Sequence, residues 1–212
     1  MEAASFSARR PVQEEPVGGR TAGIPAIANP APLGLAGFAL TTFVLSMVNS
    51  GLVSDKAEPV VFGLALAYGG IAQLLAGMWE FKTGNTFGAT AFASYGAFWI
   101  SFWALVQFFL KDIPAADAGH AVGLYLWAWA IFTTYMFIAS LRTTGAVALV
   151  FILLAITFVL LAIGKSGDHT TVTHWGGYFG IATAIAAWYA SFAAVTNATF
   201  GRTVLPVIPL NE

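Results

Sequence analysis

The sequence contains no cysteine. This excludes disulfide bonds, thiolate metal sites and cysteine nucleophiles. Charged residues are also scarce, because only 9% of the chain is Asp, Glu, Lys or Arg, against about 25% in an average globular protein. The formal net charge is −1 and no run of basic residues occurs, which argues against nucleic acid as a partner. The composition therefore does not fit a soluble domain.

Motifs of the common enzyme and metal-binding classes are also missing. No nucleophile elbow, Walker A loop or dinucleotide fingerprint occurs, so we expect no enzyme and no nucleotide cofactor. His169 and His174 are five residues apart, which differs from the i, i+4 spacing of a helical zinc site. We therefore expect no metal.

Long apolar runs dominate the chain. It is 58% hydrophobic with a mean hydropathy of +0.77. Since lipid cannot satisfy backbone polar groups, a spanning run of about 20 residues predicts a helix. The sequence therefore predicts an all-α integral membrane protein with a six-transmembrane-helix bundle. The expected spans are residues 33–53, 59–79, 87–110, 121–141, 145–163 and 175–195.

The polar segments divide the chain and suggest its orientation. Residues 1–28 lack the apolar segment of a signal peptide, and we expect a disordered cytoplasmic N-terminal tail there. Residues 29–201 form the expected six-helix membrane domain, and residues 202–212 a cytoplasmic C-terminal tail. Six helices place both termini on one side. That side carries six Lys and Arg residues against three on the other, so we expect both termini in the cytoplasm.

Two helix starts share a pattern. Residues 29–38 read N-P-A-P-L-G-L-A-G-F, and residues 84–92 read G-N-T-F-G-A-T-A-F. An asparagine side chain can cap a helix, and the N-terminus of a helix carries partial positive charge. Paired interruptions in apolar segments indicate a transport site. We therefore expect interrupted helix starts, with Asn29 and Asn85 each capping a half-helix that faces a shared aqueous path.

Few charges fall within or beside the spans, and Glu80 is the only carboxylate that could take part in proton coupling. A path through the bundle would therefore be lined by hydroxyl, amide and apolar side chains, which suits a small, weakly charged solute. These residues leave three readings open. They are a channel or transporter for a small carboxylate, which the resemblance described next would narrow to acetate-like acids, a channel for ammonia, formate or water, and a non-transporting membrane sensor.

Two motifs carry a resemblance to a known family. N-P-A-P-L-G-L at residues 29–35 and F-G-R-T-V-L-P at residues 200–206 resemble the hallmarks of the acetate uptake transporter family, also called the succinate–acetate permease family. The resemblance covers residues 29–206. It implies a multi-pass protein of the plasma or inner membrane that passes acetate, and in some members succinate or other small carboxylates. It also implies a homohexamer in which each protomer has its own path, with the lipid bilayer around it.

The resemblance further implies roles for individual residues. An apolar constriction is expected at Phe38, Tyr95 and Leu154, and a hydrophobic ring of this kind can gate a path by excluding water. Whether transport is proton-linked is left open. The residues expected along the substrate path are Asn29, Thr42, Gln73, Asn85, Thr86, Ser94 and Asn197.

Overall fold

The computed structural model describes residues 27–210, and six long apolar helices run through this part of the chain. The prediction of six spanning helices is confirmed. Two of the six spans contain a π-helical segment. The spans are α1 (Ala31–Asn49); α2 (Val60–Leu66), η2 (Ala67–Ala72) and α3 (Gln73–Thr83); α4 (Thr86–Ala104), η3 (Leu105–Phe109) and η4 (Leu110–Asp112); α5 (Ala115–Ser140); α6 (Gly145–Ser166); and α7 (Thr170–Phe200). A short 3-10 turn, η1 (Asp55–Ala57), precedes α2.

Both asparagines expected as caps accept a hydrogen bond from a first-turn N–H group, although Asn85 is the N-cap residue of α4 whereas Pro30 is that of α1. The Asn29 side-chain oxygen accepts a hydrogen bond from the Ala31 N–H at 3.0 Å, and the Asn85 side-chain oxygen accepts one from the Gly88 N–H at 3.0 Å. The helices that follow, α1 and α4, each continue for 19 residues. Both asparagines therefore begin full-length helices, and the expected half-helices are not formed.

The irregular turns lie inside the second and third spans instead. The π-helical turn η2 contains Gly69 and Gly70, and both are buried. A Cβ added at Gly69 would lie 2.8 Å from Cβ of Thr41, and one added at Gly37 would lie 2.6 Å from the Tyr68 carbonyl oxygen. The glycines thus let α1 and η2 touch along their backbones. Single π turns are frequent at functional sites, and this one directly precedes the buried Gln73.

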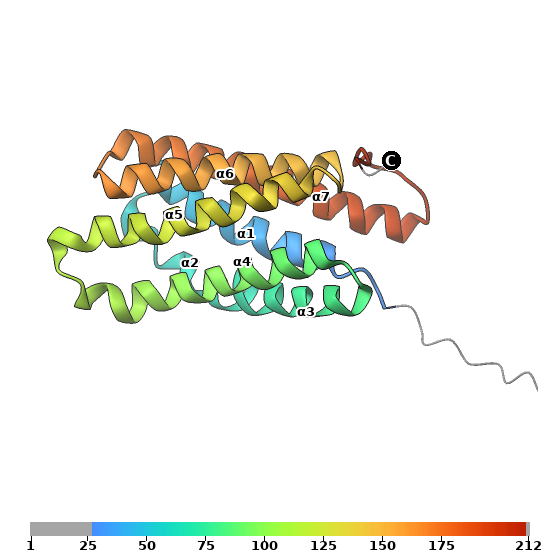
Figure 1. Cartoon of the computed structure of the whole chain (residues 1–212), viewed down its shortest axis with the longest axis horizontal. Helices are drawn as coiled ribbons and strands as arrows, with labels where there is room; N and C mark the ends of the chain where they lie inside the picture. Colours follow the sequence, from blue (N-terminus) through green and yellow to red (C-terminus); the bar gives the residue numbers. More distant parts are fainter. Residues whose placement is uncertain (1–26, 211–212) are drawn as a thin grey trace, which may run out of the picture.

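The helices lie side by side, and both ends of the described chain are at the same end of the bundle (Figure 1). Helix α1 lies between two groups of helices. On one side it packs against α7, which packs against α6, and α6 in turn packs against α5. On its other side it contacts η2 and α3, which pack against α4. The interior between these groups holds the cavities described below.

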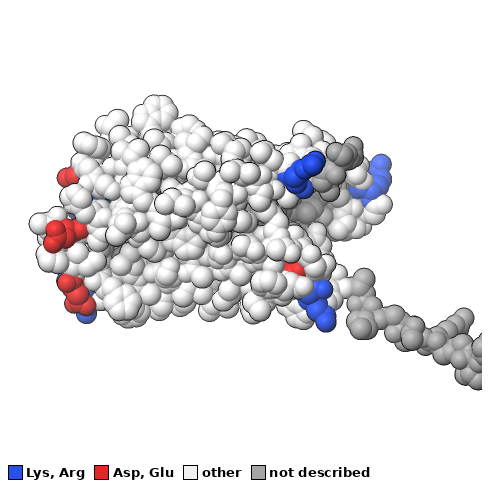
Figure 2. All heavy atoms as spheres, viewed as in Figure 1, with Lys and Arg blue, Asp and Glu red and all other residues white. Residues whose placement is uncertain are grey.

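On the face shown in Figure 2, the charged side chains of the described residues lie at the two ends, and the surface between them is uncharged. This distribution, together with the six apolar helices, is that of a multi-pass membrane protein. Among the described residues, three Lys or Arg side chains lie at each end, so the orientation in the membrane stays an expectation. Those at the end that carries the termini are Lys82, Arg142 and Arg202, and those at the far end are Lys56, Lys111 and Lys165.

A segment after α7 folds back onto the bundle. We call residues 201–210 the C-terminal strap. The carbonyls of Ile208 and Val207 accept hydrogen bonds from the N–H groups of Gly145 and Ala146, at 2.7 and 3.2 Å. The strap thereby satisfies donors in the first turn of α6 that would otherwise lack partners. The tail expected at residues 1–28 lies almost entirely outside the described residues.

Candidate functional site

A small cavity in the middle of the bundle brings together the three residues expected at a constriction. We call it the narrow cavity. Its volume is about 20 Å³, which is room for about one water molecule. Phe38 of α1, Tyr95 of α4 and Leu154 of α6 all contribute to its wall. The complete lining is Phe38, Gln73, Ala91, Phe92, Tyr95, Val150, Phe151 and Leu154.

Tyr95 is held firmly at this cavity. Its side chain is 2% exposed, and its hydroxyl lies 2.9 Å from Oγ1 of Thr133 on α5. The ring centre is 5.7 Å from that of Phe38 and 5.4 Å from that of Phe132. Buried hydroxyls are normally hydrogen-bonded, so this bond orients the ring and leaves its apolar face available to line the cavity.

Two polar side chains close to Phe38 have no hydrogen-bond partner within the described part of the chain. Gln73 is 1% exposed, and neither its amide oxygen nor its amide nitrogen is paired. Thr42, one helical turn after Phe38, is 6% exposed and its hydroxyl is also unpaired. An unpaired buried polar group costs about 1–3 kcal/mol. Such groups call for an explanation, and a solute or water in the narrow cavity would give Gln73 a partner.

A second cavity opens from the narrow cavity toward the chain termini. We call it the termini-side cavity, and its volume is about 120 Å³. It shares Ala91, Phe92 and Phe151 with the narrow cavity. Asn85, at the start of α4, also contributes to its wall. The capped end of α4 therefore faces a space that leads to the constriction.

Two larger cavities lie toward the far end. The first, which we call the aromatic chamber, is about 270 Å³, and its wall includes Phe98 and Phe158. These residues lie one helical turn beyond Tyr95 and Leu154, respectively. The second, which we call the polar mouth, is about 390 Å³ and shares Asn49, Glu58, Gly119 and Lys165 with the chamber. The four cavities thus follow one another between the two ends of the bundle, although the chamber and the narrow cavity share no lining residue.

The remaining residues expected on the path lie apart from these four cavities. Asn29 and Thr86 are exposed, and Ser94 is half-buried. Asn197 binds the C-terminal strap. Its side-chain oxygen accepts from the N–H groups of Val204 and Leu205 at 2.7 and 2.9 Å, and its side-chain nitrogen donates to the Leu205 carbonyl at 2.9 Å.

Glu80 is the one buried acidic side chain among residues 27–210, with an exposed fraction of 1%. The Thr83 hydroxyl donates to its Oε2 at 3.1 Å, and its Oε1 has no partner in the described chain. The carboxyl packs against the first turn of α4, since a Cβ added at Gly88 would lie 2.8 Å from Cδ of Glu80. It therefore lies close behind Asn85, outside the cavity wall.

The sequence did not predict the residues that line the aromatic chamber and the polar mouth. Phe98, Tyr125, Glu58 and Lys165 line these cavities, yet they come from four separate parts of the sequence. No local motif marks them, and only helix packing brings them together. Within residues 27–210, no group of three or more His, Asp or Glu side chains is placed to hold a metal ion.

Comparisons with known proteins agree with this arrangement. The sequence matches the family described as GPR1/FUN34/yaaH over residues 17–212. "Acetate permease A" of Emericella nidulans is 43% identical over 195 residues, which cover 85% of this chain and 65% of that protein. "Succinate-acetate/proton symporter SatP" of Escherichia coli is 40% identical, with 85% of this chain and 95% of that protein covered. The chain thus spans slightly less than two thirds of the fungal relative's length.

A solved structure is also similar. It is described as that of the bacterial acetate channel SatP, and it superimposes on this chain with a TM-score of 0.80 at 40% sequence identity. The superposition covers 86% of this chain and 99% of the solved one. The six-helix architecture is therefore shared over nearly the whole membrane part.

Proposed function

The chain belongs to the GPR1/FUN34/yaaH family, and from that premise we propose that it is a membrane channel or transporter for acetate and related small carboxylates, succinate included. The relatives above are named as a permease, a symporter and a channel, not as enzymes. The observation that carries the proposal is the series of four cavities between the two ends of the bundle, of which the smallest is lined by Phe38, Tyr95 and Leu154.

The constriction suits a small solute that sheds its water. The narrow cavity has room for about one water molecule, so an acetate ion with its hydration shell does not fit. A protonated acid, or an anion that exchanges water for the Gln73 amide, meets a smaller barrier at such an apolar neck. Movement of the Phe38 or Tyr95 ring would open the neck further.

Polar groups at the helix starts would attract the carboxylate before it reaches the neck. The N-terminus of α4 carries partial positive charge, and its cap, Asn85, lines the termini-side cavity. Asn29, just before α1, accepts the Ala31 N–H at the same end of the bundle. Replacing both with leucine should weaken acetate binding, and unchanged binding would remove the two asparagines from the path.

Glu80 is the side chain that supports coupling of acetate transport to protons. It is a buried carboxyl with one unpaired oxygen, and it packs against the same end of α4 as Asn85. If Glu80 exchanges protons during transport, the Glu80→Gln variant loses the pH dependence of acetate uptake. Asp117→Asn, an exposed carboxylate at the far end, serves as its control. An unaltered pH profile in Glu80→Gln would leave a channel, or a solute that carries its own proton.

We place the protein in the cell membrane as a homohexamer, with both termini in the cytoplasm and one path in each protomer. Large apolar side chains stand exposed along α5 at a spacing of three to four residues, as expected for a face that meets lipid or a neighbouring protomer. These side chains are Leu124, Trp127, Ile131, Tyr135 and Ile138. Native mass spectrometry of the detergent-purified chain measures the number of protomers.

The function is tested by transport in liposomes. The purified chain is reconstituted, and uptake of labelled acetate is followed with and without an inward proton gradient, beside protein-free liposomes that report leakage of the neutral acid. We expect protein-dependent uptake that excess unlabelled acetate or succinate suppresses. Uptake no faster than in protein-free liposomes would reject acetate, and labelled formate and methylamine, an ammonia analogue, would then be tried in the same preparation.

A further inference from the structure

The aromatic chamber and the polar mouth meet at a rim made by Asn49, Glu58, Gly119 and Lys165. On one side of the rim the wall is largely aromatic and aliphatic, and on the other it is largely polar and charged. A solute that moves between the two spaces passes these four residues. The rim is therefore the last polar contact before the apolar part of the path.

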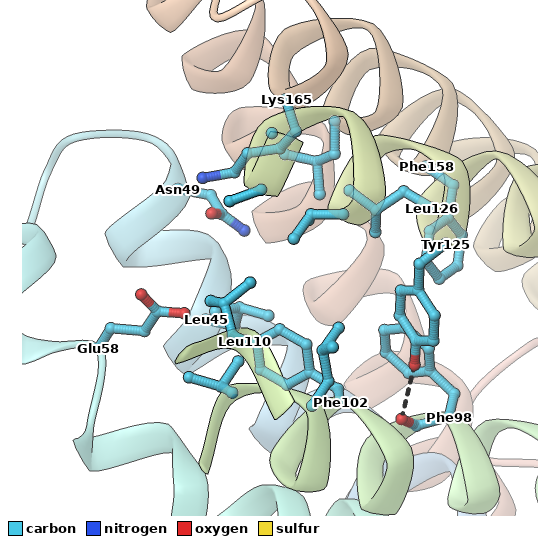
Figure 3. A pocket seen from close by; sticks show the side chains of 16 residues that line it. Leu45, Asn49, Glu58, Phe98, Phe102, Leu110, Tyr125, Leu126, Phe158 and Lys165 are labelled. Atoms are coloured by element: carbon cyan, nitrogen blue, oxygen red, sulfur yellow. Dashed lines mark hydrogen bonds between the residues drawn. The ribbon is translucent and has the colours of Figure 1, made fainter. Parts of the chain in front are cut away.

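The charged groups of the rim face one another across the opening (Figure 3). The Lys165 amine ends beside the Asn49 amide, and the Glu58 carboxylate lies across the opening from them. An ammonium and an amide N–H₂ together are suited to hold a carboxylate. Glu58 presents to Lys165 the same chemical group that an acetate ion would present.

Other titratable groups surround Glu58. Asp55 of η1, Asp168 of the α6–α7 loop and His174 of α7 line the polar mouth beside it, and Tyr125 of α5 lines the chamber below. Burial raises the pKa of the Glu58 carboxyl, while the attraction of Lys165 lowers this pKa by less and the repulsion of Asp55 adds to the rise. Glu58 is therefore protonated at a higher pH than an ordinary glutamate.

We propose that Lys165 and Asn49 form a docking site for small carboxylate ions at the mouth remote from the chain termini, and that charged Glu58 competes with the ion for Lys165. The inference rests on the proposed function, and it adds where the solute first binds and how its binding is regulated. As the pH falls, Glu58 becomes neutral and no longer attracts Lys165. Occupancy by acetate ions, at a fixed concentration of the ion, then rises.

Uptake kinetics in liposomes test the site with the full chain. KM is calculated on the concentration of the acetate ion, after subtraction of leakage, at about pH 5.5 and about pH 7.5, on either side of neutrality. Lys165→Met should raise KM by about two- to fivefold, the effect of losing a partly exposed ion pair, with little change in kcat. Glu58→Gln should lower KM at the higher pH, and the KM of the unsubstituted chain should approach that of Glu58→Gln as the pH is lowered.

The double variant separates competition from independent effects. Because Glu58 acts through Lys165, Glu58→Gln combined with Lys165→Met should have the KM of Lys165→Met alone. Lys111→Met and Asp112→Asn change exposed charges at the same end that line neither cavity, and both should leave KM unchanged. An unchanged KM in Lys165→Met, or a Glu58→Gln effect that persists without Lys165, overturns the proposal.

A binding measurement in detergent tests the docking site separately from the proposed transport function. Saturation-transfer NMR with acetate as the probe reports binding to the solubilised chain without transport. A weaker acetate signal in Lys165→Met than in the unsubstituted chain would support the docking site even if liposome uptake were absent and the proposed function rejected. An equal signal in Lys165→Met and in the unsubstituted chain would overturn the site even if uptake were normal.

Discussion

The hydroxyl of Tyr95 lies 2.9 Å from Oγ1 of Thr133, and this hydrogen bond joins α4 to α5 beside the narrow cavity. Both side chains are buried. Tyr95→Phe keeps the ring but removes the bond, so it should lower the free energy of unfolding by about 1 kcal/mol. Chemical unfolding in detergent, followed by tryptophan fluorescence, measures this. Tyr135→Phe, on the exposed face of α5, should change nothing, and equal stability of Tyr95→Phe would contradict the structural role of the bond.

Leu154 contributes bulk to the same cavity, at 3% exposure. Leu154→Ala should enlarge the neck and admit larger monocarboxylates, such as propionate or lactate, that compete poorly in the unsubstituted chain. The same change should cost about 2–5 kcal/mol of stability, as for other buried leucines. Inhibition of labelled acetate uptake by each acid measures the size limit. Leu149→Ala, on the exposed face of α6, is the control, and an unchanged size limit in Leu154→Ala would place the neck elsewhere.

Substitution of Gln73 should change stability and transport in opposite directions. Its buried amide has no partner in the described chain, so Gln73→Leu removes an unpaired polar group and should raise the free energy of unfolding by roughly 1 kcal/mol. If the amide binds the solute at the neck, the same variant should take up acetate more slowly. Gln107→Leu, exposed in η3, should affect neither quantity. A Gln73→Leu variant that transports normally would make the amide a hydrogen-bond partner of buried water only.

The fold was largely predictable because the length of each apolar run determines where a helix spans the membrane. The six runs identified the six spans, and the prolines and asparagines marked the starts of α1 and α4 within two residues. The last span was predicted as residues 175–195 but runs from Thr170 to Phe200. Its polar ends continue the helix beyond the apolar stretch, since helix propensity and packing do not stop at the edge of the membrane.

The site was predictable only in part. The family resemblance supplied Phe38, Tyr95 and Leu154, which line one cavity, but their part in transport stays a prediction. The π turn η2 was not predicted, because the adjacent Gly69 and Gly70 are equally compatible with a regular helix that packs closely. The rim of Glu58 and Lys165 joins residues more than a hundred positions apart, and such contacts leave no periodic or local signal in one sequence.

Asn197 was expected on the substrate path and is bound to the C-terminal strap by three hydrogen bonds. Asn197→Ala should release the strap, and trypsin should then cut after Arg202 about tenfold faster or more, because each lost bond contributes about 1 kcal/mol. Thr199→Ala, an exposed change on the same helix, should leave the cleavage rate unaltered. Acetate uptake by the same variants tests the path role directly, and normal uptake by Asn197→Ala would limit this residue to holding the strap.

The raised pKa of Glu58 also predicts how stability depends on pH. Burial is its main cause, so the folded state holds this proton more tightly than the unfolded state. The resulting stabilisation is fully present below the ordinary value of 4.5 and is lost as the pH rises through the raised pKa. Relative to Glu58→Gln, which cannot ionise, the unsubstituted chain should therefore lose thermal stability in detergent as the pH is raised from about 4 toward neutrality.

The Lys165→Met background tests the cause of this dependence. Without the attraction of Lys165, the pKa of Glu58 should rise further, so the melting temperatures with and without Glu58→Gln should differ more at neutral pH than they do when Lys165 is present. An equal difference in both backgrounds would show that Lys165 does not act on Glu58. The same result would remove the electrostatic contact on which competition at the rim depends, whereas a larger difference would demonstrate that contact independently of any transport measurement.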